Sequence, residues 1–237
     1  MKALKESKAI LFDLDGTLLP LDFDELLNHY FGLLSKEFSD LAKQDKFVKV
    51  LMTGTEKMIR NNGEKTNQKV FLDYFLNELE INSQEKLLNR IDDFYQEKFP
   101  QLGAIVQEKN QAAKLVKLLS QDYKLILATN PLFPKQAIIE RLNWAKLKVD
   151  HFSFITSYEN MHYAKPNPNY YQEILEQEEL NPKECIMVGN DMQHDMVAKK
   201  LGCYTFLVED FLINREDKPD YDVDWRGSFK ELLHKVQ

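Results

Sequence analysis

One stretch of the chain decides its fold, and it reads Ala9-Ile10-Leu11-Phe12-Asp13-Leu14-Asp15-Gly16-Thr17. Its first four residues form a continuous apolar run, which is typical of a parallel strand that is covered on both faces. Asp13 and Asp15 follow where such a strand would end, and Gly16 permits a sharp turn away from it. The stretch therefore predicts a central, buried strand with two carboxylates at its carboxyl end.

Similar apolar runs recur later in the chain, at residues 125–128, 152–155, 185–188 and 204–207. Segments with apolar residues at helical spacing separate most of these runs. Strands that alternate with helices are typical of βαβ units. The fold class that we predict is therefore α/β, with a Rossmann-like parallel sheet flanked by helices.

The pattern changes between Asp22 and Phe99, where apolar residues recur at helical spacing and no strand-like run occurs. Amphipathic faces lie within residues 23–38, 70–79 and 87–95, and a shorter helix is expected near Glu56 to Arg60. Such helices bury their apolar stripes against one another. We predict an all-helical cap domain over residues 21–99 and a Rossmann-like catalytic core over residues 1–20 and 100–237, joined by irregular links at about 18–21 and 99–105.

Polar segments follow the later strand-like runs, namely Thr129-Asn130, Lys165-Pro166, and Gly189-Asn190-Asp191 with Asp195. In an open α/β sheet, the loops beyond the carboxyl ends of the strands converge on one crevice. We therefore expect these segments to build one site together with Asp13 and Asp15. A group of carboxylates with one balancing lysine suits a site that holds Mg²⁺ and presents an oxygen nucleophile to a phosphoryl group.

The order and type of these residues resemble the motifs of the haloacid dehalogenase (HAD) superfamily. Its first motif is Asp-x-Asp-Gly-Thr, its second a serine or threonine, its third a lysine and its fourth an acidic pair. The resemblance implies a HAD-like phosphatase, in which Mg²⁺-dependent hydrolysis of a small phosphate monoester passes through an aspartyl-phosphate, with a helical cap after the first motif. Many members begin the fourth motif with Gly-Asp, whereas this chain has Gly189-Asn190 and places its first acid at Asp191.

The expected catalytic residues are Asp13, Asp15 and Lys165. A carboxylate at a rigid strand end can attack phosphorus, which makes Asp13 the expected nucleophile. Asp15 projects to the same side of an extended chain and can act as general acid and then as general base. Lys165 is expected to neutralise the charge of Asp13 and of the phosphate.

Phosphate binding is expected from Gly16, Thr129, Asn130 and Lys165. The backbone amides that follow Gly16 can face the phosphate. The side chains of Thr129 and Asn130 can donate hydrogen bonds to phosphoryl oxygens.

For Mg²⁺, the expected ligands are the carboxylates of Asp13 and Asp191 and the backbone carbonyl of Asp15. Residues 189–195 are expected to open a helix, which places Asp195 one turn after Asp191. Asn190 and Asp195 should then lie behind the ligands, where Asp195 orients either a water molecule or Lys165.

Composition narrows the class of protein. With 237 residues, 43% of them apolar, the chain can bury a sizeable core. Its formal charge of −7 argues against a nucleic-acid surface. No apolar run approaches the ~20 residues that cross a bilayer, and the amino terminus lacks the apolar stretch of a secretory signal. We expect a cytoplasmic protein without membrane contact, with Cys185 and Cys203 buried and free, and with a small phosphorylated metabolite as its partner.

Several alternatives stay open from the sequence. A sugar phosphomutase keeps the same residues, and a catalytically silent binding module could keep the same fold. Dehalogenation is disfavoured because Asp15 and the acidic fourth motif suit metal-assisted phosphoryl transfer. The sequence names neither the substrate nor the oligomeric state; Arg60, Asn61 and Asn62 are candidates for setting substrate specificity.

Overall fold

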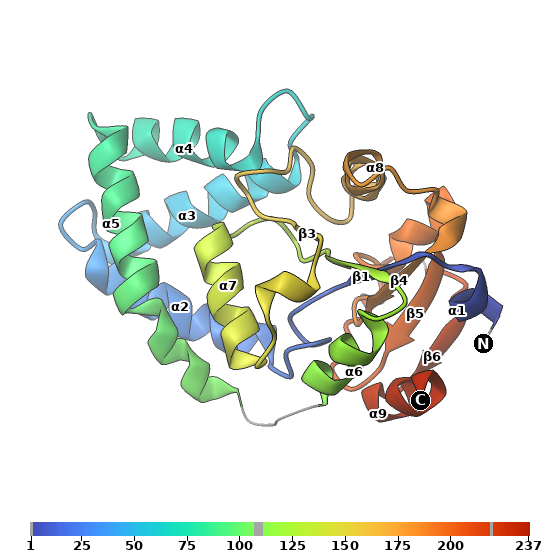
Figure 1. The fold of residues 1–237 in the computed structure, drawn as a ribbon. Helices are drawn as coiled ribbons and strands as arrows, with labels where there is room; N and C mark the ends of the chain where they lie inside the picture. The colour runs from blue at the N-terminus through green and yellow to red at the C-terminus, as the bar shows by residue number, and fades with distance from the viewer. Residues whose placement is uncertain (1, 107–110, 219) are drawn as a thin grey trace.

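The computed structural model describes residues 2–106, 111–218 and 220–237. Its strands form one six-stranded sheet in the order β3-β2-β1-β4-β5-β6, and every neighbouring pair is parallel (Figure 1). The strands are β1 (Ala9–Phe12), β2 (Lys124–Leu127), β3 (Phe154–Ile155), β4 (Cys185–Gly189), β5 (Tyr204–Val208) and β6 (Trp225–Gly227). The predicted α/β class is confirmed. The chain moves outward from β1 to β3 and then returns to the other side of β1, so a crevice lies beyond the ends of β1, β2 and β4.

Both faces of the sheet are covered by helices, which explains the continuous apolar runs. Ile10 and Phe12 of β1 pack in one cluster with α6 (Ala112–Leu119) and α9 (Phe229–Val236). Ala9 and Leu11 pack in a second cluster with α8 (Pro168–Gln177). Successive residues of a strand point to opposite faces, so every position of β1 is buried.

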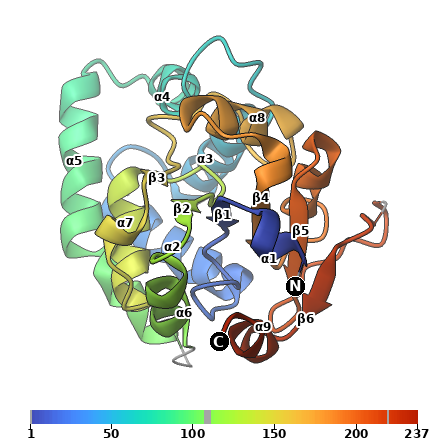
Figure 2. The same ribbon diagram turned by 45° about the vertical axis from the view of Figure 1, so that its right-hand side comes forward.

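The segment after the first motif is all helical, as the sequence predicts. Figures 1 and 2 show its helices grouped beside the sheet. They are α2 (Phe23–Glu37), α3 (Gln44–Ile59), α4 (Asn67–Glu78) and α5 (Gln84–Glu97). The side chains of Asp22, Thr66 and Ser83 accept backbone hydrogen bonds at the starts of α2, α4 and α5, which fixes where these helices begin. The exact division between core and cap stays a prediction.

Two predictions within this segment are wrong. The short helix expected near Glu56 to Arg60 is the end of the 16-residue helix α3. Charged and polar residues separate the buried residues of α3, so its apolar face is hard to recognise in the sequence. The buried residues, which keep helical spacing, are Phe47, Val50, Leu51, Gly54 and Met58. The second link is a 3-10 helix, η1 (Phe99–Ile105), and not an irregular segment. It is ordered because Phe99 is buried and stacks on Trp144, with ring centroids 5.2 Å apart.

The remaining elements show two further differences from the sequence-based expectation. Strand β6 has only three residues and was not predicted. Residues 192–195 form a turn, and the 3-10 helix η4 (Met196–Leu201) begins only after Asp195. The other elements are α1 (Lys2–Glu6), α7 (Lys135–Trp144), η2 (Val149–His151) and η3 (Pro182–Glu184). Cys185 and Cys203 are buried and free, as expected. In the part of the chain that the structure describes, no helix is long and apolar enough to cross a membrane.

Candidate active site

The predicted lysine stands between two carboxylates at the carboxyl ends of the strands. Lys165 Nζ lies 2.8 Å from Asp13 Oδ1 and 2.6 Å from Asp195 Oδ1. Lys165 and Asp195 are each 1% exposed, and Asp13 is 8% exposed. Burial opposes the charge of Lys165, but the two carboxylates outweigh it and raise its pKa well above the usual value. Lys165 is therefore a fixed positive charge beside Asp13.

Asp15 forms an ion pair that the sequence did not predict. Its Oδ2 accepts a hydrogen bond from Arg141 Nη1, on α7. Burial raises the pKa of Asp15 to about 6, and the charge of Arg141 limits this rise. Arg141 is itself 1% exposed, and its guanidinium lies over the ring of Phe133, 4.7 Å from the centroid. Asp15 Oδ1 and Arg141 Nη2 are buried without a hydrogen-bond partner among the described residues.

Gly16 lets the first motif approach the fourth. Its φ is +78°, in the left-handed region, and a Cβ at this position would collide with the side chain of Asn190. Asn190 Oδ1 accepts a hydrogen bond of 3.1 Å from Thr17 Oγ1, and its Nδ2 donates to the carbonyl of Phe211 at 2.6 Å. Asn190 thus joins the two motif loops.

Asp191 is held by a second arginine that sequence reasoning missed. Arg215 Nη1 lies 2.7 Å from Asp191 Oδ1, and Nη2 lies 2.9 Å from Oδ2. The backbone N–H groups of Gln193 and His194 also donate to Oδ1, at 3.0 and 2.9 Å. Burial opposes the charge of Asp191, but the bonds from Arg215 outweigh it and lower its pKa.

Asp195 lies behind Asp13, in contact with Lys165. Its Oδ2 accepts a hydrogen bond of 3.0 Å from the backbone N–H of Asp191. Gly189 is needed for this approach because a Cβ there would collide with the Asp195 carboxylate. Asp195 was expected to orient either a water molecule or Lys165. Its contact with Lys165 fits the second of these roles.

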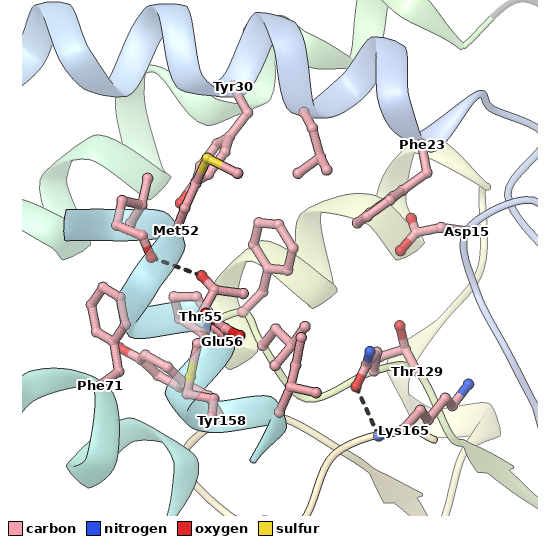
Figure 3. Close-up of a pocket in the computed structure, with 18 of the residues that line it drawn as sticks. Asp15, Phe23, Tyr30, Met52, Thr55, Glu56, Phe71, Thr129, Tyr158 and Lys165 are labelled. Carbon is pink, nitrogen blue, oxygen red and sulfur yellow. Dashed lines mark hydrogen bonds between the residues drawn. The ribbon is translucent and has the colours of Figure 1, made fainter. Parts of the chain in front are cut away.

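Thr129 and Asn130 follow β2 at the same end of the sheet. Asn130 Oδ1 accepts a hydrogen bond of 3.1 Å from the backbone N–H of Lys165, drawn as a dashed line in Figure 3. This bond ties the second motif to the third. The side chain of Thr129 is buried at the border of the crevice, and its carbonyl accepts from Thr156 Oγ1 and Tyr170 OH at 2.7 and 2.8 Å.

A cavity of about 480 Å³ opens above these residues and extends into the cap. Figure 3 shows Asp15, Thr129 and Lys165 on one side and Tyr30, Met52 and Phe71 on the other. The expected specificity residues Arg60, Asn61 and Asn62 do not line this cavity. Asn61 instead donates within its own loop, to the carbonyl of Lys65 at 2.8 Å and to Asn67 Oδ1 at 2.9 Å.

The donors fit a magnesium ion in their chemistry. Asp13, Asp15 and Asp191 all border the cavity, and together they supply two carboxylates and a backbone carbonyl. Mg²⁺ prefers such oxygen donors and commonly keeps several waters beside one or two carboxylates. Among the described residues, no three histidine, cysteine, aspartate or glutamate side chains form a group that could hold a metal ion. Waters and the carbonyl would have to complete the coordination.

Sequence comparison agrees with this architecture. Residues 10–208 match the model of the haloacid dehalogenase-like hydrolases. The chain belongs to this family. It is 26% identical to the pyrophosphatase PpaX of Bacillus mycoides, over 96% of this chain and 97% of the relative. It is also 26% identical to a phosphoglycolate phosphatase of Aliivibrio fischeri, over 85% of this chain and 84% of the relative.

Solved structures of HAD proteins share the fold. The HAD hydrolase YfnB of Bacillus subtilis, described as bound to magnesium, superimposes with a TM-score of 0.58 at 19% identity, covering 97% of this chain and 98% of that protein. A 2-haloacid dehalogenase of Pseudomonas syringae superimposes with a TM-score of 0.64 at 18% identity, covering 97% of each chain. At these identities the likeness concerns the fold alone.

Proposed function

We propose that this HAD protein hydrolyses small phosphate monoesters with Mg²⁺, through an aspartyl-phosphate formed on Asp13. The observation that carries the proposal is the contact of Lys165 with both Asp13 and Asp195. This contact holds a charged lysine beside the carboxylate that would attack phosphorus. The curated relatives named phosphatases support the same class of reaction.

In the first step, a carboxylate oxygen of Asp13 attacks phosphorus, and the bond from phosphorus to the ester oxygen breaks. Asp15 gives its proton to that oxygen, so the alcohol leaves neutral. Burial favours this proton because it raises the pKa of Asp15 to about 6. Lys165 offsets the negative charge that collects on the phosphoryl oxygens.

In the second step, Asp15 takes a proton from water as the water oxygen attacks phosphorus. The bond between Asp13 and phosphorus breaks, and inorganic phosphate leaves. Asp13, the Asp15 carbonyl and Asp191 would hold Mg²⁺, whose charge stabilises the transferring phosphoryl group when it is bound. Thr129 and Asn130 line the cavity where the phosphate would bind, whereas Gly16 lies outside that lining and contributes by letting the first motif loop approach Asn190.

Hydrolysis is favoured over the sugar phosphomutase reaction by the cap side of the cavity. A sugar phosphate needs polar groups that hold its hydroxyls, and this side is lined mainly by apolar residues. A catalytically silent module would not need the buried ion pairs around Asp13 and Asp15.

The test of the proposed function is phosphate release from a panel of monoesters, measured with Mg²⁺ and with a chelator. Phosphate release that requires Mg²⁺ supports the proposal. If no ester in the panel releases phosphate, the proposal is contradicted.

A further inference from the structure

We infer that the substrate of this site is a phosphate monoester whose alcohol part is bulky and hydrophobic, and that the cap side of the cavity binds this part. The inference rests on the proposed function, because it names what is attached to the phosphoryl group. It also departs from the relatives, whose names refer to pyrophosphate and phosphoglycolate.

The cavity has two chemically different sides. The core side carries the carboxylates, Lys165 and Arg141. On the cap side most of the lining is aliphatic, aromatic or thioether, and residues 21–99 are all described. Within that range only Thr55 and Glu56 are polar lining residues without an aromatic ring. An apolar group on the substrate would therefore meet apolar surface as soon as it left the phosphate site.

The few polar groups on the cap side already have partners. Thr55 Oγ1 donates to the carbonyl of Leu51 at 3.0 Å, and Glu56 forms an ion pair of 2.6 Å with Arg60. The hydroxyls of Tyr30 and Tyr95 lie 2.7 Å apart and bond to each other. A hydroxyl or carboxylate that entered this side would lose its water and gain few hydrogen bonds in return, which selects against polar alcohols.

One further donor at the site, Nη2 of Arg141, does not change this conclusion. It has no hydrogen-bond partner among the residues that the structure describes, but the same guanidinium is bonded to Asp15. It therefore lies at the core end, where the ester oxygen and the phosphoryl group are expected. Polar recognition is concentrated at that end of the substrate.

The size of the cavity favours a bulky alcohol part over a very small one. Its volume of about 480 Å³ lies within the range of roughly 300–1,000 Å³ found for sites that enclose drug-sized ligands. A two-carbon alcohol would leave most of this apolar surface in contact with water. A ring or a chain of several carbons would cover it.

The test uses three esters with the same kind of primary alkoxide leaving group, so that the chemistry at phosphorus is matched. They are 3-phenylpropyl phosphate, propyl phosphate and 3-carboxypropyl phosphate, assayed with Mg²⁺. Burial of an aromatic ring should raise kcat/KM for the phenylpropyl ester by roughly 10- to 100-fold over the propyl ester. The carboxypropyl ester should be no better than the propyl ester.

A cap variant links this preference to the cavity. Met52 lines the cavity and is 57% exposed, so Met52→Glu adds a charge at little risk to folding. The ratio of kcat/KM for the phenylpropyl and propyl esters should fall at least tenfold in Met52→Glu and persist in Met52→Leu. Gln44→Glu adds the same charge at the exposed start of α3, outside the cavity lining, and should keep the ratio.

Failure of this inference differs from failure of the proposed function. Hydrolysis of the three esters with equal kcat/KM, or a preference for the carboxypropyl ester, overturns the hydrophobic substrate and leaves the phosphatase intact. If no ester is hydrolysed, the proposed function fails. The affinities of 3-phenylpropylphosphonate and propylphosphonate, measured by calorimetry, then test whether the cavity has an apolar subsite. Tighter binding of the phenylpropyl compound supports an apolar subsite, and equal binding overturns it.

Discussion

Arg141 forms a buried ion pair with Asp15, the residue that would carry the proton in both steps of hydrolysis. The arginine comes from α7, so a helix that flanks the sheet reaches into the catalytic end. Because Arg141 holds one carboxylate oxygen of Asp15, it fixes the direction of the other. We assign Arg141 as a positioning residue for Asp15.

Removal of this pair should change the pH profile. Arg141→Gln should lower kcat/KM roughly 10- to 100-fold, a part of the ~10²–10⁴-fold that a placed general acid contributes. The charge of Arg141 lowers the pKa of Asp15, so its loss should raise that pKa. Since the first step needs protonated Asp15, the loss of activity on the basic side should begin at a higher pH.

Arg141→Lys is the matched control for this prediction, because it keeps the positive charge. In this variant, activity on the basic side of the pH profile should fall at nearly the same pH as in the unmodified protein. An Arg141→Gln profile that is lower at every pH but not displaced would mean that Arg141 has only a structural role.

Arg215 should compete with Mg²⁺ for Asp191, since its guanidinium occupies both carboxylate oxygens. Arg215→Gln should therefore tighten Mg²⁺ binding, by about tenfold, the lower end of what neighbours of a metal ligand typically change. Calorimetric titration with Mg²⁺ gives the comparison. Arg226→Gln removes an arginine that pairs with Glu209 and should leave the affinity unchanged. Weaker binding in Arg215→Gln would contradict the competition.

The two acids of the fourth motif should differ in their effect on the metal. Asp191→Asn removes a proposed ligand and should weaken Mg²⁺ binding by more than the ~10–100-fold typical of a residue behind the ligands. Asp195→Asn should weaken it less, because Asp195 contacts Lys165. A larger loss of affinity in Asp195→Asn than in Asp191→Asn would reverse the assignment.

The sequence could predict the central sheet because its signal is local. Every position of the run Ala9–Phe12 is buried. Such a run can be recognised as a strand from its own residues, without knowledge of what packs against it. Strand β6 was missed because Trp225–Gly227 is short and only its last residue is buried. The link at residues 99–105 was misread because its order comes from the stacking of Phe99 on Trp144, which is distant in the chain.

The site was predictable to the extent that its residues lie in motifs. Asp13, Lys165, Asp191 and Asp195 all lie near the crevice, as expected from the strand ends. The two arginines lie 126 residues from Asp15 and 24 residues from Asp191, and they were not predictable because they belong to none of the motifs. Neither arginine stands in a pattern that distinguishes it from a surface residue. The cavity likewise depends on how helices far apart in the sequence pack together.

The junction between the helical segment and the sheet should depend strongly on Phe99. This side chain is fully buried and packs on Trp144 and Tyr95. Phe99→Ala should lower the free energy of unfolding by about 3 to 5 kcal/mol, the cost of a large cavity in a core. Denaturant titration measures it, with Leu212→Ala, at a 38% exposed position, as a control that should have little effect.

If the proposed mechanism operates, Asp13 becomes phosphorylated during turnover. The direct measurement is to mix the protein with Mg²⁺ and an excess of a hydrolysable ester, to quench in acid within a turnover, and to map the modified peptide by mass spectrometry. We expect the mass of one phosphoryl group on Asp13, absent without Mg²⁺, and no phosphate release by Asp13→Asn. Steady phosphate release with Asp13 unmodified, or substantial turnover by Asp13→Asn, would contradict it.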